Sequence, residues 1–123
     1  MPKKVDPSLP TEDAVDRFER LSPLLESIYE EMKEFSKKKA DGPLNPLKVK
    51  MINKILAQVK EFLVQDPNVE FLELLEEATL PTNSDTVLII GQFRAILNQF
   101  KARFYFYDRD EGEHRWRTQE NPE

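Results

Sequence analysis

Side chains able to carry out catalysis are scarce in this sequence of 123 residues. It contains a single histidine, His114, and no cysteine. One histidine does not provide a set of metal ligands, and the lack of cysteine removes disulfides, thiolate nucleophiles and cysteine-based zinc sites. We therefore expect neither a metal nor another cofactor, and we expect a binding protein in preference to an enzyme.

Aromatic side chains gather near the C-terminal end and are interleaved with arginines. These residue types dominate the energetically important contacts between proteins. A helical stripe would bury Phe104 and Tyr107 but direct Tyr105 and Phe106 elsewhere. Alternatively, the last residues fold back and Trp116 covers the aromatic rings. The residues predicted to bind another protein or a second copy of the chain are Arg103, Tyr105, Phe106, Tyr107, Arg109 and Trp116. Stacking on single-stranded bases is a third interpretation, opposed by six acidic residues in 108–123.

Four residues separate Arg109 from His114. This spacing resembles the arginine–histidine motif of the HEPN family, whose members are small helical bundles and include dimeric ribonucleases. The resemblance implies that both side chains would act on a scissile phosphate at a dimer cleft. It covers six residues, a segment that is acidic overall and includes Gly112, whereas the family motif lies on a packed helix. A HEPN-like ribonuclease is therefore the alternative function to protein binding.

Lysines are concentrated between residues 32 and 60, which carry eight lysines and two acidic residues. Five of them flank one expected connection between helices and would lie at one pole of the molecule. This pole could contact an anion or a nucleic acid, or the lysines could offset a helix dipole and keep the surface soluble. The net charge of −5 argues against a general nucleic-acid binder. The five residues are Lys37, Lys38, Lys39, Lys48 and Lys50.

Four glutamates lie close together at positions 70, 73, 76 and 77. Carboxylate oxygens suit hard cations such as calcium, but a metal site in a helical bundle needs carboxylates that project inward. These four lie opposite the apolar residues of their segment and are expected to face solvent. They could instead form a second docking surface, for a basic partner.

The elements that must position these residues are helices, because apolar residues recur at alternating spacings of four and three. This repeat places them on one stripe of each helix, which must pack against another helix. The stripe of the first helix is Ala14, Phe18, Leu21, Leu25, Ile28, Met32 and Phe35. That of the last helix is Thr86, Ile90, Phe93, Leu97, Phe100, Phe104 and Tyr107.

Capping residues and prolines set the expected ends of four helices. Thr11 begins a helix that runs to about residue 39, and Pro23 either kinks it or breaks it. Asn45 and Pro46 begin a second helix that stops by residue 65, with Met51 among its inward residues. A short helix at 67–78 buries Phe71, and a last helix extends from residues 82–84 to about 107. An alternative pairs residues 103–108 and 114–118 as strands, since aromatic residues favour strands.

These elements predict an all-α fold, an antiparallel up-down bundle of three long helices and one short helix. Residues 1–10 form a flexible N-terminal arm, 11–107 the helical domain and 108–123 a polar C-terminal tail. No apolar stretch approaches the length of a membrane span. The lack of both cysteine and a secretory signal favours the cytoplasm. The expected function is a small subunit, adaptor or inhibitor that binds a protein through its C-terminal aromatic and arginine residues.

Overall fold

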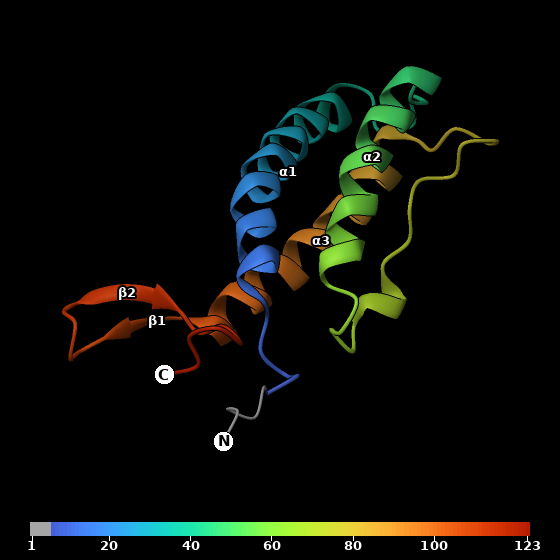
Figure 1. Ribbon diagram of the computed structural model, residues 1–123. Coiled ribbons are helices and arrows are strands. Elements are labelled where there is room, and N and C mark those ends of the chain that lie inside the picture. Colours follow the sequence, from blue (N-terminus) through green and yellow to red (C-terminus); the bar gives the residue numbers. More distant parts are fainter. Residues whose placement is uncertain (1–5) are drawn as a thin grey trace.

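A computed structural model describes residues 6–123 and shows a mostly helical chain with three helices and a small two-stranded sheet (Figure 1). The first five residues of the expected arm lie outside the described residues. The elements are α1 (Glu12–Lys38), α2 (Pro46–Phe62), the 3₁₀ helix η1 (Val69–Phe71), α3 (Asn83–Phe104), β1 (Tyr105–Asp108) and β2 (Glu113–Trp116). Within 6–123 no helix combines the length and the apolar character needed to cross a membrane.

Helix α1 is continuous from Glu12 to Lys38, although Pro23 lies inside it. The hydroxyl of Thr11 accepts a hydrogen bond from the Ala14 N–H at 3.1 Å and caps the first turn, as predicted. Leu21 and Leu25, on either side of the proline, are both buried. The apolar stripe therefore keeps its phase through Pro23, and the helix does not break there.

Helix α2 begins as expected, with the Asn45 side chain accepting from the Lys48 N–H at 2.8 Å. Its buried face comprises Val49, Ile52, Leu56 and Val59. The expectation that Met51 points inward is wrong, because this side chain is 60% exposed. Successive residues lie 100° apart around a helix, so the face centred on Ile52 and Leu56 leaves Met51 outside it.

The predicted helix at 67–78 is largely absent. Only η1 is helical there, and residues 72–81, here called the linking segment, contain neither helix nor strand. The side-chain amide of Asn53 holds this segment through both of its polar atoms. Its Nδ2 donates to the Leu75 carbonyl at 2.9 Å, and its Oδ1 accepts from the Leu75 N–H at 2.8 Å. Leu72 and Leu75 are buried, whereas Phe71 is 66% exposed, contrary to prediction. A short helix is marginal in isolation, so these contacts with α2 decide the conformation.

Helix α3 begins within the expected range of residues 82–84, with Thr82 as its cap: the Thr82 hydroxyl accepts a hydrogen bond from the Asp85 N–H at 3.1 Å. The stripe from Thr86 to Phe100 is buried as expected. The helix ends at Phe104, not at residue 107, and the chain continues directly into β1. The strand alternative is therefore correct for residues 105–108, and the all-α description is wrong in this part of the chain.

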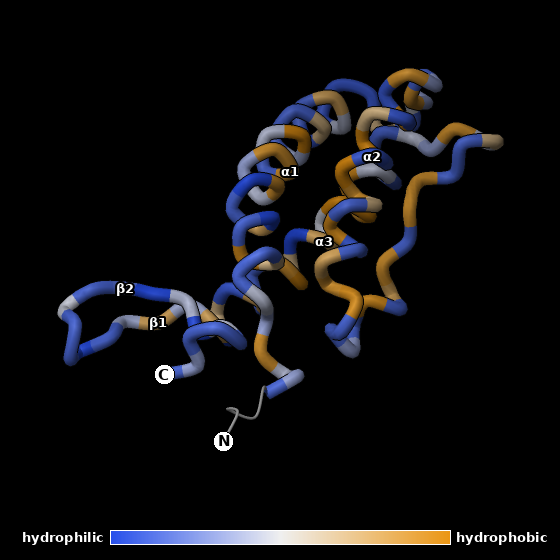
Figure 2. Tube along the Cα trace, in the orientation of Figure 1, coloured by the Kyte–Doolittle hydropathy of each residue, from blue (hydrophilic) through white to orange (hydrophobic). Residues whose placement is uncertain are grey.

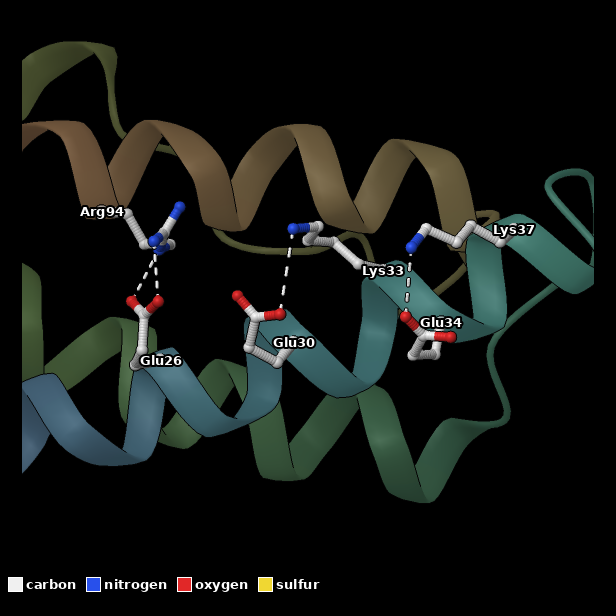
Figure 3. Close-up of polar contacts among 6 residues, drawn as sticks. All are labelled: Glu26, Glu30, Lys33, Glu34, Lys37 and Arg94. Carbon is white, nitrogen blue, oxygen red and sulfur yellow. Dashed lines mark hydrogen bonds and ion pairs between the residues drawn. The ribbon is translucent and has the colours of Figure 1, made fainter.

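The core is formed where α1 packs against both α2 and α3. An ion pair joins α1 to α3, in which Arg94 donates to both carboxylate oxygens of Glu26 at 2.7 Å (Figure 3). The Arg94 guanidinium also lies 3.9 Å from the centroid of the Tyr29 ring. Hydrophobic residues are concentrated on the helices and the linking segment, whereas the tip of the hairpin is hydrophilic (Figure 2).

The two ends of the described chain pack together, with residues 9–12 of the expected arm against residues 118–120 of the expected polar tail. The Gln119 side chain donates to the Leu9 carbonyl, and its main-chain N–H donates to the Pro10 carbonyl, both at 2.9 Å. Leu9 and Thr118 are buried. The Glu120 carboxylate accepts from the Glu12 N–H at 2.9 Å, at the positive end of the α1 dipole.

Candidate functional site

The C-terminal hairpin is formed by β1 and β2, which pair antiparallel in the register Tyr105 with Trp116 and Tyr107 with His114. Side chains alternate between the two faces of a strand, so these four lie on one face, here called the aromatic face. The Tyr105 and His114 rings stack with centroids 5.4 Å apart, and Tyr107 meets the edge of His114 at 5.1 Å. The aromatic face therefore presents a row of rings held by one another.

Trp116 fixes the hairpin to the helices. Its ring packs against Phe18 of α1 at 5.2 Å and Phe100 of α3 at 5.7 Å between centroids. Its indole N–H donates to the Glu19 carboxylate at 3.0 Å. Trp116 is thus half-buried and acts as an anchor, which agrees with the interpretation that the C-terminal residues fold back over the aromatics.

The opposite face of the hairpin combines Phe106 with arginines. The guanidinium groups of Arg115 and Arg117 lie 4.7 and 5.3 Å from the Phe106 ring centroid, within the range of cation–π attraction. Arg115 also donates to the Asp108 carboxylate at 2.6 Å. Neither Arg115 nor Arg117 was among the predicted binding residues. Their alternation with His114 and Trp116 in the sequence is the pattern of a strand, and it could have indicated that the two arginines share one face.

Asp108 organises the turn of the hairpin. Its second carboxylate oxygen accepts from the main-chain N–H groups of Asp110 at 2.9 Å and Glu111 at 3.2 Å. The hydrogen bond from Arg115 is the main reason why the pKa of the Asp108 carboxyl lies below its ordinary value, and the hydrogen bonds from the main chain lower it further. Gly112 has a φ of 69°, in the left-handed region that glycine adopts without strain.

The predicted binding residues differ in how accessible they are. Tyr107 is 54% exposed, and Arg103 and Arg109 are exposed as well. Tyr105 and Phe106 are half-buried, and the Lys101 ammonium lies 5.0 Å from the centroid of the Tyr105 ring. The structure brings Tyr105, Tyr107 and Trp116 together on the aromatic face, whereas Phe106 lies on the other face and Arg109 in the turn.

The helical context that the HEPN resemblance requires is absent. Arg109 lies in the turn between the strands, and His114 lies on β2 with its ring against two tyrosines. The two residues therefore do not lie on one packed helix. Within one copy of the chain, no contact joins the Arg109 and His114 side chains into a phosphate site.

The lysines predicted to form one pole lie at the end of α1, directly after it at Lys39, and near the beginning of α2. Lys37 pairs with Glu34 at 3.2 Å (Figure 3), and the Lys48 ammonium lies 4.2 Å from the Phe35 ring centroid. Lys38, Lys39 and Lys50 are exposed. Two of the five therefore make local contacts of the kind that stabilise a surface.

The four glutamates at 70, 73, 76 and 77 are exposed, as expected. Throughout residues 6–123 there is no cluster of three or more histidine, aspartate and glutamate side chains able to hold a metal ion. The glutamates do not form one face of a helix as expected, because most of them lie on the linking segment, which is not helical.

Sequence reasoning missed a cavity of about 300 Å³ between the start of α1 and the ends of α2 and α3. Its charged side chains largely pair with one another, since Arg17 contacts Asp13 at 3.2 Å and Glu61 at 3.0 Å. The lining includes Leu9, Arg17, Phe62, Phe100, Arg103 and Gln119. Within residues 6–123 no buried side-chain nitrogen or oxygen atom lacks a hydrogen-bond partner, so no unpaired buried side chain in the cavity points to a ligand.

Comparison of the chain with protein-family models, with curated proteins and with solved structures finds no match.

Proposed function

We propose that this chain is a small non-catalytic module that binds another protein through its C-terminal hairpin. The observation that carries the proposal is the exposed ring of Tyr107 at the outer end of the aromatic face, on a hairpin that projects from the helices (Figure 1). Large aromatic rings and arginines are the side chains that contribute most to protein–protein binding.

The contacts of the hairpin support this proposal. Tyr107 and His114 fix each other's rings, and Arg115 is held by Asp108 and lies over Phe106. Binding costs free energy when side chains must be ordered, so rings that are already fixed lose less on association. Arg109 and Tyr107 supply a charged and an aromatic contact near the tip, where solvent reaches both.

We further propose that the three helices form an antiparallel up-down bundle that supports the hairpin. The short connection between α1 and α2 and the packing of α1 against both other helices support this arrangement. A cytoplasmic location is proposed as well, because the sequence has no cysteine.

Affinity capture from the native cell tests the function, with Tyr107→Ser compared against the unchanged chain. Leu88→Ser is the matched control, since Leu88 is a 64% exposed apolar residue on α3, outside the hairpin. We expect one or more proteins to be lost with Tyr107→Ser and kept with Leu88→Ser, at equal helicity by circular dichroism. An identical set of captured proteins with all three chains would refute the hairpin as the binding surface.

A further inference from the structure

The outer edge of β2 carries main-chain groups that the hairpin does not use. The Arg117 N–H donates to the Phe104 carbonyl at 2.7 Å. Antiparallel pairs alternate between hydrogen-bonded and non-bonded, so the observed register makes Phe106 with Arg115 the next bonded pair. The N–H and C=O groups of His114 and Trp116 therefore point away from β1, and within residues 6–123 no hydrogen bond from outside the hairpin reaches them.

The side chains of this edge are self-complementary in one register. Glu113, Arg115 and Arg117 share one face of the strand, and His114 and Trp116 share the other. If a second β2 lies antiparallel with Arg115 opposite Arg115, each Glu113 faces an Arg117 and each His114 faces a Trp116. Opposite charges and aromatic pairs across strands are stabilising.

The same register satisfies the main chain. With Arg115 at the centre, the outward groups of His114 in one copy face those of Trp116 in the other, and the two residues become a hydrogen-bonded pair. The central arginines are like charges, but each already donates to an Asp108 carboxylate at 2.6 Å. Strand β2 contains no lysine or proline, which are residues that commonly keep sheet edges from pairing.

An isolated two-stranded hairpin is marginally stable, whereas three or more strands with an apolar face are stable. We propose that two copies of this chain join their β2 edges in this register to form a four-stranded sheet in the strand order β1-β2-β2-β1. The proposal rests on the proposed function of the hairpin and names the partner as a second copy of the chain. Because the strands are four residues long, the buried area is small, and the association is weak and depends on concentration.

Charge reversal at the paired positions tests this register by analytical ultracentrifugation over a range of concentrations. Glu113→Arg alone places arginine opposite the partner subunit's Arg117 at both ends of the junction, and Arg117→Glu alone places glutamate opposite the partner subunit's Glu113. Each variant should dimerise about tenfold more weakly or worse. An equal mixture of the two restores both opposite-charge pairs and should recover a dimer. Glu111→Arg makes the same charge change in the turn and should leave dimerisation unchanged.

Proline at position 114 provides a second, independent test. His114→Pro removes the outward N–H together with the imidazole ring that contacts Tyr105 and Tyr107. The hydrogen bonds between β1 and β2 do not involve this N–H, and proline is tolerated at such edge positions. We expect it to abolish the dimer, whereas His114→Ala keeps the N–H and should retain a weakened dimer. The fluorescence of the single tryptophan, Trp116, reports whether the hairpin is still docked on the helices.

The outcomes separate the two proposals. A chain that stays monomeric at all concentrations, or a dimer that is indifferent to both charge reversals and to His114→Pro, overturns pairing through β2. If Tyr107→Ser still removes a captured protein under those circumstances, the hairpin binds a different partner and the proposed function stands. If neither assay responds to changes in the hairpin, both proposals fail.

Discussion

At the scale of single residues, Asp108 connects the two strands and the turn. It pairs with Arg115 at 2.6 Å and accepts two main-chain N–H groups. Such a carboxylate satisfies several donors at once, and an amide in its place could not keep the charge-assisted contact to arginine. The hairpin should therefore depend on the ionised form of this one side chain.

The pH dependence of the hairpin follows from the lowered pKa of Asp108. The unfolded carboxyl binds a proton more readily than the folded one, so this contribution to stability is complete above the ordinary aspartate pKa near 4 and is lost as pH falls through the lower folded value. Amide hydrogen exchange of Phe106 and Arg115 should rise in that acidic range. Asp108→Asn should raise exchange already at neutral pH and remove the acidic transition.

Asp110→Asn is the control for this experiment, because the Asp110 side chain makes no hydrogen bond or ion pair within the described residues. It should leave both the neutral exchange rates and the acidic transition as they are in the unchanged chain. Equal responses of the two variants would show that the transition reflects the general charge of the turn and not Asp108.

At the scale of elements, the linking segment lacks regular structure and is held to α2 by one side chain. Asn53 supplies both a donor and an acceptor to Leu75. The side chains of Leu75 itself and of Leu72 are buried. The segment also accepts a main-chain hydrogen bond at its far end, from the Leu44 N–H to the Pro81 carbonyl at 2.9 Å. Loss of the Asn53 contact alone should therefore release the residues around Leu75.

Asn53→Ala should lower the free energy of unfolding by about 1–3 kcal/mol, since two hydrogen bonds are lost and the Leu75 groups are left without partners. Asn53→Asp retains the acceptor and should be intermediate. Chemical denaturation gives the free energies, and amide exchange at Leu75 gives the local effect. A loss of stability with an unchanged Leu75 exchange rate would contradict the role assigned to Asn53.

At the scale of the whole molecule, the core is shared by all three helices, and Phe93 of α3 lies fully buried within it. Phe71 is also a phenylalanine but projects from η1 and is 66% exposed. The cost of truncating a side chain depends on the cavity it leaves and not on its type alone. These two residues therefore distinguish the observed fold from one in which residues 67–78 form a buried helix.

Phe93→Ala should destabilise the protein by about 3–5 kcal/mol, and Phe71→Ala by about 0.5 kcal/mol or less. Thermal or chemical unfolding followed by circular dichroism measures both. Comparable large losses for the two variants would indicate that Phe71 is buried, and the arrangement of the linking segment described above would then be wrong.

The sequence by itself determined the three long helices and where they begin. The caps at Thr11, Asn45 and Thr82 and the apolar stripes are local patterns, and local geometry is sufficient to interpret them. The aromatic residues of the C-terminal region were also identified as a group, although their division between two faces of a hairpin was not.

Only the tertiary structure decided the conformations of residues 67–81 and 105–116. Asn53 meets Leu75 across 22 positions, and Trp116 meets Glu19 across 97. Both segments have apolar spacings compatible with a helix, so their local preferences are nearly balanced, and contacts with distant residues select the outcome. Such contacts exist only once the chain has folded, and they are not encoded in the periodicity of either segment.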